Sequence, residues 1–399
     1  MSKDETPVVN TLLITVMAVS CGLSVANLYY SQPLLADIQR DFGVSVREAG
    51  LIPMLTQVGY ATGMLFFVPL GDMVEGRALI TTMLAAVACA LLAAAVSPSF
   101  AWLAAASLLV GLTTIVPQLI FPFAARLAGE EARGRVVGTV MSGLLLGILL
   151  ARTLGGFVGA RAGWRGMYWM AAGAMAVLAL ALRGLLPVSR PRFGGSYLRL
   201  MFSLVALARE HTTLREASFT GAMLFGSFSA FWTTLVFLLG QPPYYYGSRA
   251  AGLFGLAGAA GALGATAAGR LSHLREPRTM LSFAVGVAAL SFAVMWSLWD
   301  HLFGLVVGVL LLDLGVQGGH VSNQIRVYAL SKEAHGRLNT VYMVSFFVGG
   351  AAGSSLGTLG WSLWRWNGVC LTGLIMLLLA LATMRLGRRE APRGLTSGC

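Results

Sequence analysis

The sequence predicts an all-α membrane protein with twelve transmembrane helices in two parallel repeats of six helices. Three observations predict this fold: the chain is unusually apolar, it contains twelve apolar runs, and its second half repeats the first. Of the 399 residues, 57% are hydrophobic and 11% are charged, whereas a soluble domain carries about 25% charged residues. The mean hydropathy is +0.76. These values exclude soluble globular, disordered and fibrous proteins.

The apolar runs are each long enough for a membrane-spanning helix, which needs roughly 20 apolar residues. Glycine, proline or arginine residues interrupt the sequence between the runs. The predicted spans are 11–36, 49–69, 79–96, 101–125, 136–158, 167–186, 215–239, 250–270, 279–299, 302–327, 338–359 and 366–386.

These spans divide the chain into four parts. We expect an N-terminal six-helix bundle at 1–186, a cytoplasmic central loop at 187–214, a C-terminal six-helix bundle at 215–386 and a cytoplasmic tail at 387–399. Within the central loop, the basic amphipathic stretch YLRLMFSLVALAREH is predicted to lie on the membrane surface.

Positive charge is distributed unevenly among the loops. Of the 28 Lys and Arg residues, 21 fall in one alternate set of loops and six in the other, and the remaining one, Arg152, lies within a span. Loops rich in Lys and Arg stay on the cytoplasmic side of a membrane, so both termini and the central loop are predicted to be cytoplasmic. This asymmetry explains most of the net charge of +12, and we expect a lipid bilayer, not nucleic acid, as the partner of these charges.

An internal repeat appears when the chain is aligned with itself at an offset of 202 residues. Charged, Gln and Trp residues recur at this one offset; the pairs are Gln39 and Gln241, Glu131 and Glu333, Arg135 and Arg337, Trp164 and Trp366, and Arg183 and Arg385. Because six spans are an even number, both halves begin on the same side of the membrane. Transporters with parallel repeats of this kind hold their cargo near the bilayer midplane. Since one chain supplies both halves, we expect it to work as a monomer.

Two stretches carry a family resemblance. After the second span, VPLGDMVEGR (68–77) resembles the G-x-L-x-D-R-x-G-R-R loop of the major facilitator superfamily. In the fifth span, GLLLGILLARTLGG (143–156) resembles the superfamily's drug-antiporter motif, with Ala151 in place of Gly and Arg152 in place of Pro. The chain is similar to the bacterial efflux-type branch, whose members resemble proton antiporters of drugs or metabolites.

This resemblance implies the major facilitator fold in the bacterial cytoplasmic (inner) membrane. It also implies two sets of residues with family roles. Asp72 and Arg77 would form a gate at the cytoplasmic ends of the helices, and the glycines of the antiporter-like motif would pack helices together; these are Gly143, Gly147, Gly155 and Gly156.

The source of energy is predicted to be an ion gradient, most simply of protons. The sequence has no G-x4-G-K-[ST] loop for ATP. Of its sixteen acids, Asp313 alone falls well inside a span, where an ionised carboxylate is costly. Asp313 is therefore either a proton-coupling or cargo site, or the static partner of a buried arginine or hydroxyl. His320 follows two helical turns later on the same face, either as a proton relay or as a hydrogen-bond partner of a neighbouring helix.

Other polar and aromatic residues within the spans are candidates for a substrate cavity: Asn27, Tyr29, Tyr30, Gln32, Gln57, Gln118, Arg152, Trp232, Gln317 and Gln324. The aromatic residues can instead belong to an interfacial belt, and the Gln residues can join helices by hydrogen bonds. Arg152 can hold an anionic group on the cargo or form a structural pair. Arg152 favours an anionic cargo and Asp313 a cationic one, so the charge of the cargo stays open.

These features predict a secondary active transporter that exports small organic molecules in exchange for protons by alternating access. The alternative is a proton-coupled symporter that takes up small organic anions. A membrane enzyme is disfavoured because the five histidines are scattered without ligand spacing, and we expect neither a metal nor a cofactor. A non-transporting sensor on the same scaffold is a further alternative.

Overall fold

The computed structural model describes residues 10–129, 132–189, 196–271, 276–331 and 333–389, without the side chains of Asp72, 264–271 and 387–389. The described residues form helices joined by turns and short connections, and no strand occurs among them. They divide into two compact units. The first comprises Met1–Phe202 and Trp232–Ala259, and the second comprises Ser203–Phe231 and Ala260–Cys399.

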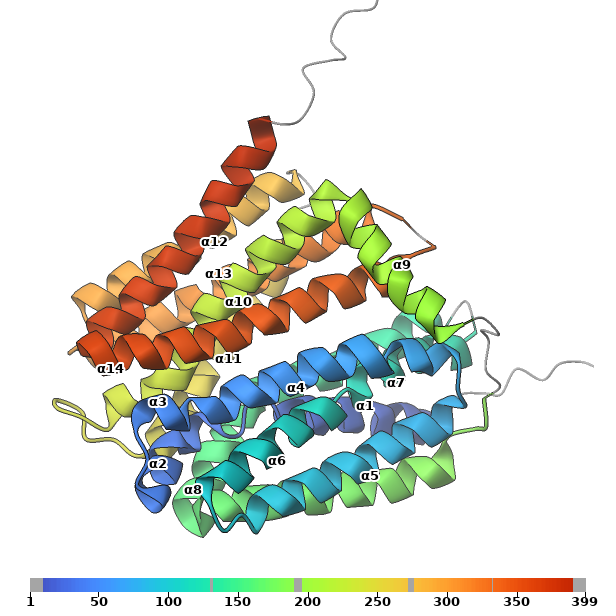
Figure 1. The fold of residues 1–399 in the computed structure, drawn as a ribbon, viewed down its shortest axis with the longest axis horizontal. Coiled ribbons are helices and arrows are strands. Elements are labelled where there is room, and N and C mark those ends of the chain that lie inside the picture. Colours follow the sequence, from blue (N-terminus) through green and yellow to red (C-terminus); the bar gives the residue numbers. More distant parts are fainter. Residues whose placement is uncertain (1–9, 130–131, 190–195, 272–275, 332, 390–399) are drawn as a thin grey trace, which may run out of the picture. The chain divides into compact units, whose positions relative to one another are not determined.

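The first unit begins with eight α-helices and two short 3₁₀ helices. Their bounds are α1 Thr11–Ala26, η1 Gln32–Leu34, α2 Leu35–Phe42, α3 Val46–Ala49, α4 Leu51–Phe67, η2 Pro69–Asp72, α5 Gly76–Ala95, α6 Phe100–Thr113, α7 Val116–Leu127 and α8 Arg133–Leu185. Helix α1 packs on α7 and α8, α4 packs on α6, and α5 packs on α6 and α8. Figure 1 shows α5 beside the second half of α8.

The first predicted span is not one α-helix to residue 36, because α1 ends at Ala26. The chain then continues in tighter turns, in which the backbone N–H of Tyr29 donates to the carbonyl of Ala26 at 2.9 Å. Pro33, which has no N–H to donate, stands at the start of η1. Hydropathy does not distinguish these turns from an α-helix, since the segment stays buried and largely apolar.

The fourth predicted span is also divided, into α6 and α7, at Thr114 and Ile115. Pro117 stands in the first turn of α7 and Pro122 lies inside it. A proline removes one backbone hydrogen bond from a helix and favours a break before it.

The predicted fifth and sixth spans form the single element α8, and the eleventh and twelfth form α14, His335–Arg389. Each element reverses at one or two residues with non-helical backbone angles. These are Gly163 (φ 73°, ψ 168°) in α8, and Trp364 (φ −135°) with Arg365 (φ 52°, ψ −137°) in α14. Figure 1 shows α14 as two red helices that meet at a corner. Gly163 and Arg365 are 202 residues apart, which is the offset of the sequence repeat.

The remaining helices are α9 Tyr197–Glu210, α10 Thr212–Leu239, α11 Ser248–Leu271, α12 Pro277–Ser297 and α13 Leu302–Tyr328. Helices α10 and α11 contribute residues to both units. In the second unit, α12 packs on α13 and on α14. The predicted amphipathic segment of the central loop is a helix, α9, with Leu198 and Phe202 exposed by 65% and 72%. Its place on a membrane surface stays a prediction.

Within the described residues, eight helices are long and apolar enough to cross a membrane. Two of them, α8 and α14, contain a reversal and each account for two crossings. Together with α1 and α11, these helices account for the twelve predicted crossings.

Candidate cargo and coupling sites

Arg152 lies at the centre of a buried group of side chains in the first unit. Its side chain is 3% exposed, and its Nε–H donates to Oε1 of Gln32 at 2.7 Å. The guanidinium carbon lies 4.7 Å from the ring centre of Tyr29 and 4.1 Å from that of Trp232, within the range of a cation–π interaction. We call Tyr29, Gln32, Arg152 and Trp232 the Arg152 site.

The turns after α1 supply two of these residues and bury two more of the predicted cavity residues. Asn27 is 5% exposed and Tyr30 is 3% exposed. The amide nitrogen and oxygen of Asn27 are buried without a hydrogen-bond partner among the described residues, as is Nε2 of Gln32. A buried polar group without a partner costs free energy, so each of these atoms is a candidate for contact with water or with a ligand.

A close crossing of α8 and α11 holds the backbone of Arg152. A Cβ atom added to Gly252 would lie 2.8 Å from the carbonyl oxygen of Arg152, and one added to Gly156 would lie 2.4 Å from that of Ser248. The Thr153 hydroxyl donates to the Gly252 carbonyl at 3.0 Å. Because glycine has no side chain, the two backbones approach each other at this crossing more closely than larger residues would allow.

Asp313 and His320 lie on α13 in the second unit. Asp313 is 4% exposed near the middle of this apolar helix. Gly261 of α11 lies against it, since a Cβ added there would be 3.1 Å from Cβ of Asp313. His320 is half-buried; its Nδ1 lies 2.9 Å from the Tyr342 hydroxyl, and its ring centre lies 4.8 Å from that of Phe346.

The four other Gln candidates lie in different places. Gln57 is buried on α4, and Gln118 is half-buried on α7, where its Nε2 donates to the Tyr60 hydroxyl at 3.3 Å. Gln317 and Gln324 are half-buried on α13, with Asp313 and His320. Within the first unit, one hydrogen bond and two cation–π contacts join Tyr29, Gln32, Arg152 and Trp232 into one site, and Gln118 contacts Tyr60.

The predicted gate loop is only partly described, because the side chain of Asp72 lies outside the described part of the chain. Arg77 is half-buried, and its backbone N–H donates to Oε1 of Glu75 at 2.9 Å. The same carboxylate accepts from the backbone N–H groups of Ala78 at 2.8 Å and Ser189 at 3.0 Å. Sequence reasoning did not select Glu75, which caps α5 and also holds the start of the central loop.

Partial burial alone would raise the pKa of the Glu75 carboxyl, but this effect is outweighed. The hydrogen bonds from Ser189, Ala78 and Arg77, with the nearby Arg77 charge, together hold that pKa below its ordinary value. The carboxylate is therefore the form that joins this loop to the end of α8.

The glycines of the antiporter-like motif lie in helix contacts of α8. A Cβ added to Gly143 would be 2.3 Å from the Ala18 carbonyl oxygen, and one added to Gly147 would be 2.1 Å from that of Gly22. Gly155 faces the backbone of Tyr30 in the same way, at 2.9 Å from its carbonyl oxygen. With Gly156 at the α11 crossing, the motif packs α8 against α1, against the turn that follows α1 and against α11.

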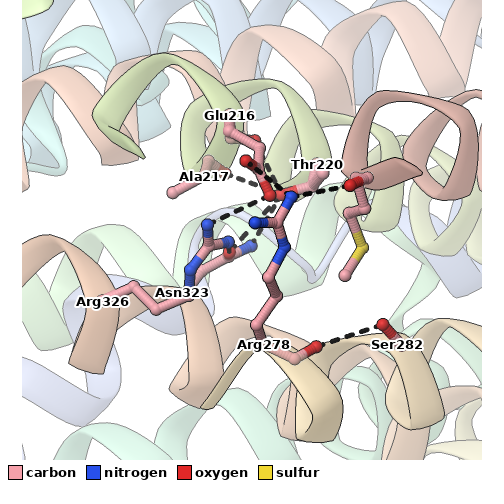
Figure 2. Close-up of polar contacts among 8 residues, drawn as sticks. Glu216, Ala217, Thr220, Arg278, Ser282, Asn323 and Arg326 are labelled. Carbon is pink, nitrogen blue, oxygen red and sulfur yellow. Dashed lines mark hydrogen bonds and ion pairs between the residues drawn. The ribbon is translucent and has the colours of Figure 1, made fainter. Parts of the chain in front are cut away.

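A cluster of buried charges in the second unit was not selected from the sequence (Figure 2). The Glu216 carboxylate on α10 lies 3.3 Å from Nη2 of Arg278 on α12 and 3.0 Å from Nη2 of Arg326 on α13. Asn323 donates to the Thr220 hydroxyl at 3.1 Å. We call Glu216, Thr220, Arg278, Asn323 and Arg326 the Glu216 cluster. Each of its charges stands near the end of a predicted span, where sequence alone does not separate a buried charge from a solvated one.

The Major Facilitator Superfamily model matches residues 14–327 of this chain. The chain is 43% identical over 381 residues to the transporter YgaY of Escherichia coli O157:H7, covering 95% of this chain and 97% of that protein. It is 35% identical over 360 residues to a probable transporter of Streptomyces coelicolor, covering 90% and 84%.

Solved structures share the fold at low sequence identity. A bacterial homolog of the human lysosomal transporter Spinster, inward-facing and unoccupied, aligns with a TM-score of 0.74 at 14% identity over 98% of both chains. A POT family transporter in complex with 5-aminolevulinic acid aligns with a TM-score of 0.77 at 11% identity, over 97% of this chain and 99% of that one. The predicted twelve-helix fold of parallel repeats is confirmed, and the chain is a multi-pass membrane transporter that belongs to the Major Facilitator Superfamily.

Proposed function

We propose that this protein exports small organic molecules from the bacterial cytoplasm in exchange for protons, by alternating access. The observation that carries the proposal is the carboxyl group of Asp313, 4% exposed in the middle of an apolar helix. An ionisable residue at such a depth in a membrane is costly and typical of an ion pathway. The glycine motif of α8, which resembles that of antiporters, supports the exchange direction.

Asp313 is suited to coupling because its two protonation states differ by a full charge. The protonated carboxyl is neutral and is tolerated by an apolar surrounding, whereas the carboxylate needs water, a cation or a hydrogen-bond donor. In the proposed cycle, Asp313 takes a proton from the outside and releases it to the cytoplasm, and each change of charge favours a different conformation. His320, two turns along the same helix face, is the proposed relay.

The proton gradient supplies enough free energy for such an exchange. One pH unit corresponds to about 1.4 kcal/mol per proton, and a potential of 100 mV adds about 2.3 kcal/mol per charge. Since a tenfold concentration ratio costs about 1.4 kcal/mol, one proton can drive a cargo gradient of more than about a hundredfold.

Asp313→Asn in liposomes that contain a trapped pH dye tests the proposal. Lipophilic cations and small carboxylates would be added in turn to the parent protein and to the variant. We expect cargo-evoked proton movement in the parent and its loss in Asp313→Asn. Asp300→Asn is the matched control, because the Asp300 carboxylate is 49% exposed in the turn between α12 and α13. Proton movement that persists in Asp313→Asn would contradict the coupling role.

A second candidate function is the proton-coupled uptake of small organic anions, which the buried Arg152 guanidinium favours. The two functions differ in direction. In right-side-out vesicles with an acidified outside, the uptake carrier would accumulate a labelled carboxylate, whereas the exporter would lose it.

We also propose the bacterial inner membrane as the location, with both termini in the cytoplasm. The supporting observation is the excess of Lys and Arg in one set of loops. A reporter that is active only in the cytoplasm, fused to the C-terminus, should be active. An active periplasmic reporter at the same position would contradict this orientation.

A further inference from the structure

We propose that Asn323 and Tyr342 are positioning residues that hold Nδ1 of His320 as a hydrogen-bond acceptor, and that His320 takes up a proton only when Asn323 releases Arg326. All four residues lie in the second unit. The proposal rests on the proposed proton coupling for its part in transport. The proton position that it assigns belongs to the protein at rest, so it can be measured without cargo or gradient.

The first step is the hydrogen bond of the His320 ring. Its Nδ1 lies 2.9 Å from the Tyr342 hydroxyl, which is the one hydrogen-bond partner of this ring among the described residues. The ring also lies against aromatic carbon, since its centre is 4.8 Å from that of Phe346, and Phe346 stacks on Phe225 at 4.2 Å. The Tyr342 hydroxyl therefore decides whether Nδ1 donates or accepts.

The second step is the orientation of Asn323 (Figure 2). A guanidinium only donates hydrogen bonds, so the Asn323 atom that lies 3.4 Å from Nη1 of Arg326 is the amide oxygen. The Thr220 hydroxyl lies closer to the Glu216 carbonyl, at 2.8 Å, than to Oδ1 of Asn323, at 3.4 Å, so it donates to the carbonyl. Its oxygen accepts from Nδ2 of Asn323 at 3.1 Å. Both neighbours give the buried amide the same direction.

The third step carries this direction to His320. Nδ2 of Asn323 has two hydrogens, one for Thr220 and one for the Tyr342 hydroxyl, with which the Asn323 amide also interacts. The Tyr342 oxygen then accepts, and its O–H is left for Nδ1 of His320. Nδ1 therefore carries no proton, and the imidazole is neutral with its proton on Nε2. An arginine that can only donate thus sets the proton position of a histidine through two intervening side chains.

The fourth step is the change that protonation requires. An imidazolium donates from Nδ1, so the Tyr342 hydroxyl has to turn its hydrogen toward Asn323, and Asn323 has to turn its oxygen toward Tyr342. Nδ2 of Asn323 would then face the Arg326 guanidinium, and a buried donor without an acceptor costs free energy. Proton uptake by His320 and the contact of Asn323 with the Glu216 cluster therefore oppose each other.

The charges around this network act on His320 in a different way. The titratable and charged groups that the described contacts place around the network are Glu216 on α10, Arg278 on α12, Arg326 and Tyr328 on α13, and Tyr342 on α14. Asp313 lies two helical turns before His320 on α13. Charges act on the ring through space, whereas the direction of the hydrogen bonds reaches it through Tyr342.

The test reads the proton position of His320 from the ring ¹⁵N chemical shifts of the purified full chain in detergent at pH 8. His320→Gln identifies the His320 signals by their absence. We expect the Nε2–H form to exceed the Nδ1–H form by about tenfold or more, since the reversed network leaves two donors facing each other. A proton on Nδ1, in a neutral ring or in an imidazolium, would overturn the proposal.

Asn323→Asp reverses the network at nearly unchanged volume. The new carboxylate only accepts hydrogen bonds, so the Tyr342 hydroxyl would donate to it, and we expect Nδ1 of His320 to carry a proton. The added negative charge lies beside Arg326, in a cluster of two arginines and one acid, so we expect the variant to fold.

Asn339→Asp is the matched control for that variant. Asn339 is half-buried on α14 and accepts from the Tyr328 hydroxyl at 2.9 Å, so the same change of charge is made outside the network. The His320 proton should stay on Nε2. A proton that stays on Nε2 in Asn323→Asp, or leaves it in Asn339→Asp, would contradict the role of Asn323.

Tyr342→Phe separates the hydrogen bonds from the field of the added charge. It removes the hydroxyl and keeps the ring, whose Cε2 would lie 2.8 Å from a Cβ added to Gly221 of α10. In this background, Asn323→Asp should no longer change the proton position of His320. If the proton still moves to Nδ1, the effect acts through space and Tyr342 does not transmit it.

Liposome measurements separate this proposal from the proposed function. If His320 has its proton on Nε2 but His320→Gln leaves cargo-evoked proton movement unchanged, the hydrogen-bond network stands and the relay role of His320 is refuted. If His320→Gln abolishes proton movement but the ring of the parent has its proton on Nδ1, the relay role is supported and the network is refuted.

Discussion

Glu216 and Arg326, which are far apart in the sequence, form an ion pair whose Oε1–Nη2 distance is 3.0 Å, and both side chains are at most 10% exposed. Arg278 makes a second contact with the same carboxylate and donates to the Met384 carbonyl at 2.6 Å. One acid thereby joins α10, α12 and α13, and Arg278 extends the connection to α14. A buried carboxylate with two arginines is stable as a set and unstable when one member is removed.

We expect Glu216→Gln to destabilise the protein strongly. The change leaves two arginines without their carboxylate in a largely buried place, and breaking a buried pair in this way costs about 3–5 kcal/mol. Thermal unfolding in detergent measures it. Glu210→Gln on the exposed part of α9 is the control, and equal melting temperatures for the two variants would refute the role of the Glu216 cluster.

Gly147→Ala is expected to weaken the contact of α1 with α8. The new Cβ would lie 2.1 Å from the carbonyl oxygen of Gly22, and a backbone atom cannot move aside as a side-chain tip does. Overpacking typically costs about 1–3 kcal/mol.

Gly138→Ala on the same helix is the control for that variant, because no heavy atom of another element lies within 4 Å of the added Cβ. Alanine favours a helix over glycine by up to about 1 kcal/mol, so this variant should melt at the parent's temperature or above. If Gly147→Ala melts at the same temperature as Gly138→Ala, the contact of α1 with α8 is not tightly packed and the expectation is wrong.

Glu75 should make stability depend on pH in the acid range. Its pKa is lowered in the folded protein, against an unfolded value of about 4.3. Its contribution to stability is therefore complete above that value and is lost as the pH falls through the folded-state pKa. The melting temperature of Glu75→Gln should lie below that of the parent at pH 7, and the difference should shrink in acid.

The control for Glu75 is Glu276→Gln. Glu276 precedes α12 as Glu75 precedes α5, but its side chain makes no capping hydrogen bond. Its melting temperature should follow that of the parent at both pH values. If the melting temperatures of Glu75→Gln and the parent differ by the same amount at pH 7 and in acid, the loss of stability is steric and not electrostatic.

Arg365→Gly is expected to stabilise the reversal of α14. Arg365 has φ of 52° and ψ of −137°, a conformation that glycine adopts freely and other residues adopt at a cost of about 1–3 kcal/mol. Its side chain is exposed, so little packing is lost. The reciprocal change, Gly163→Arg in α8, should lower the melting temperature. Changes in melting temperature of opposite sign for the two variants would confirm the expectation, and changes of the same sign would contradict it.

Most of the fold could be predicted from the sequence, because apolar runs of membrane length and a repeat at one offset do not depend on tertiary contacts. The end of α1 at Ala26 could not. The turns that follow, with their tyrosines and Pro33, remain as buried as a helix would be, and hydropathy reports burial, not hydrogen-bond pattern. For the same reason, the break between α6 and α7 could not be predicted from hydropathy.

Some residues of the candidate sites could be selected from the sequence and others could not. Arg152 and Asp313 stand out in the sequence because a charge inside an apolar run is rare. Their neighbours depend on which helices cross, and this is why Gln32 and Trp232 could be selected only as members of a longer set. The Glu216 cluster escaped selection because its charges lie near span ends, where charges are common.

The reversals within α8 and α14 leave almost no connecting peptide between paired crossings. A protease needs several residues of extended chain to bind its substrate, and an inserted tag needs a tolerant loop. Neither exists at Gly163 or at Arg365. A purification tag or a crystallisation partner is better inserted in the central loop near Ser196, and limited digestion should leave these two helical hairpins whole while separating the halves of the chain.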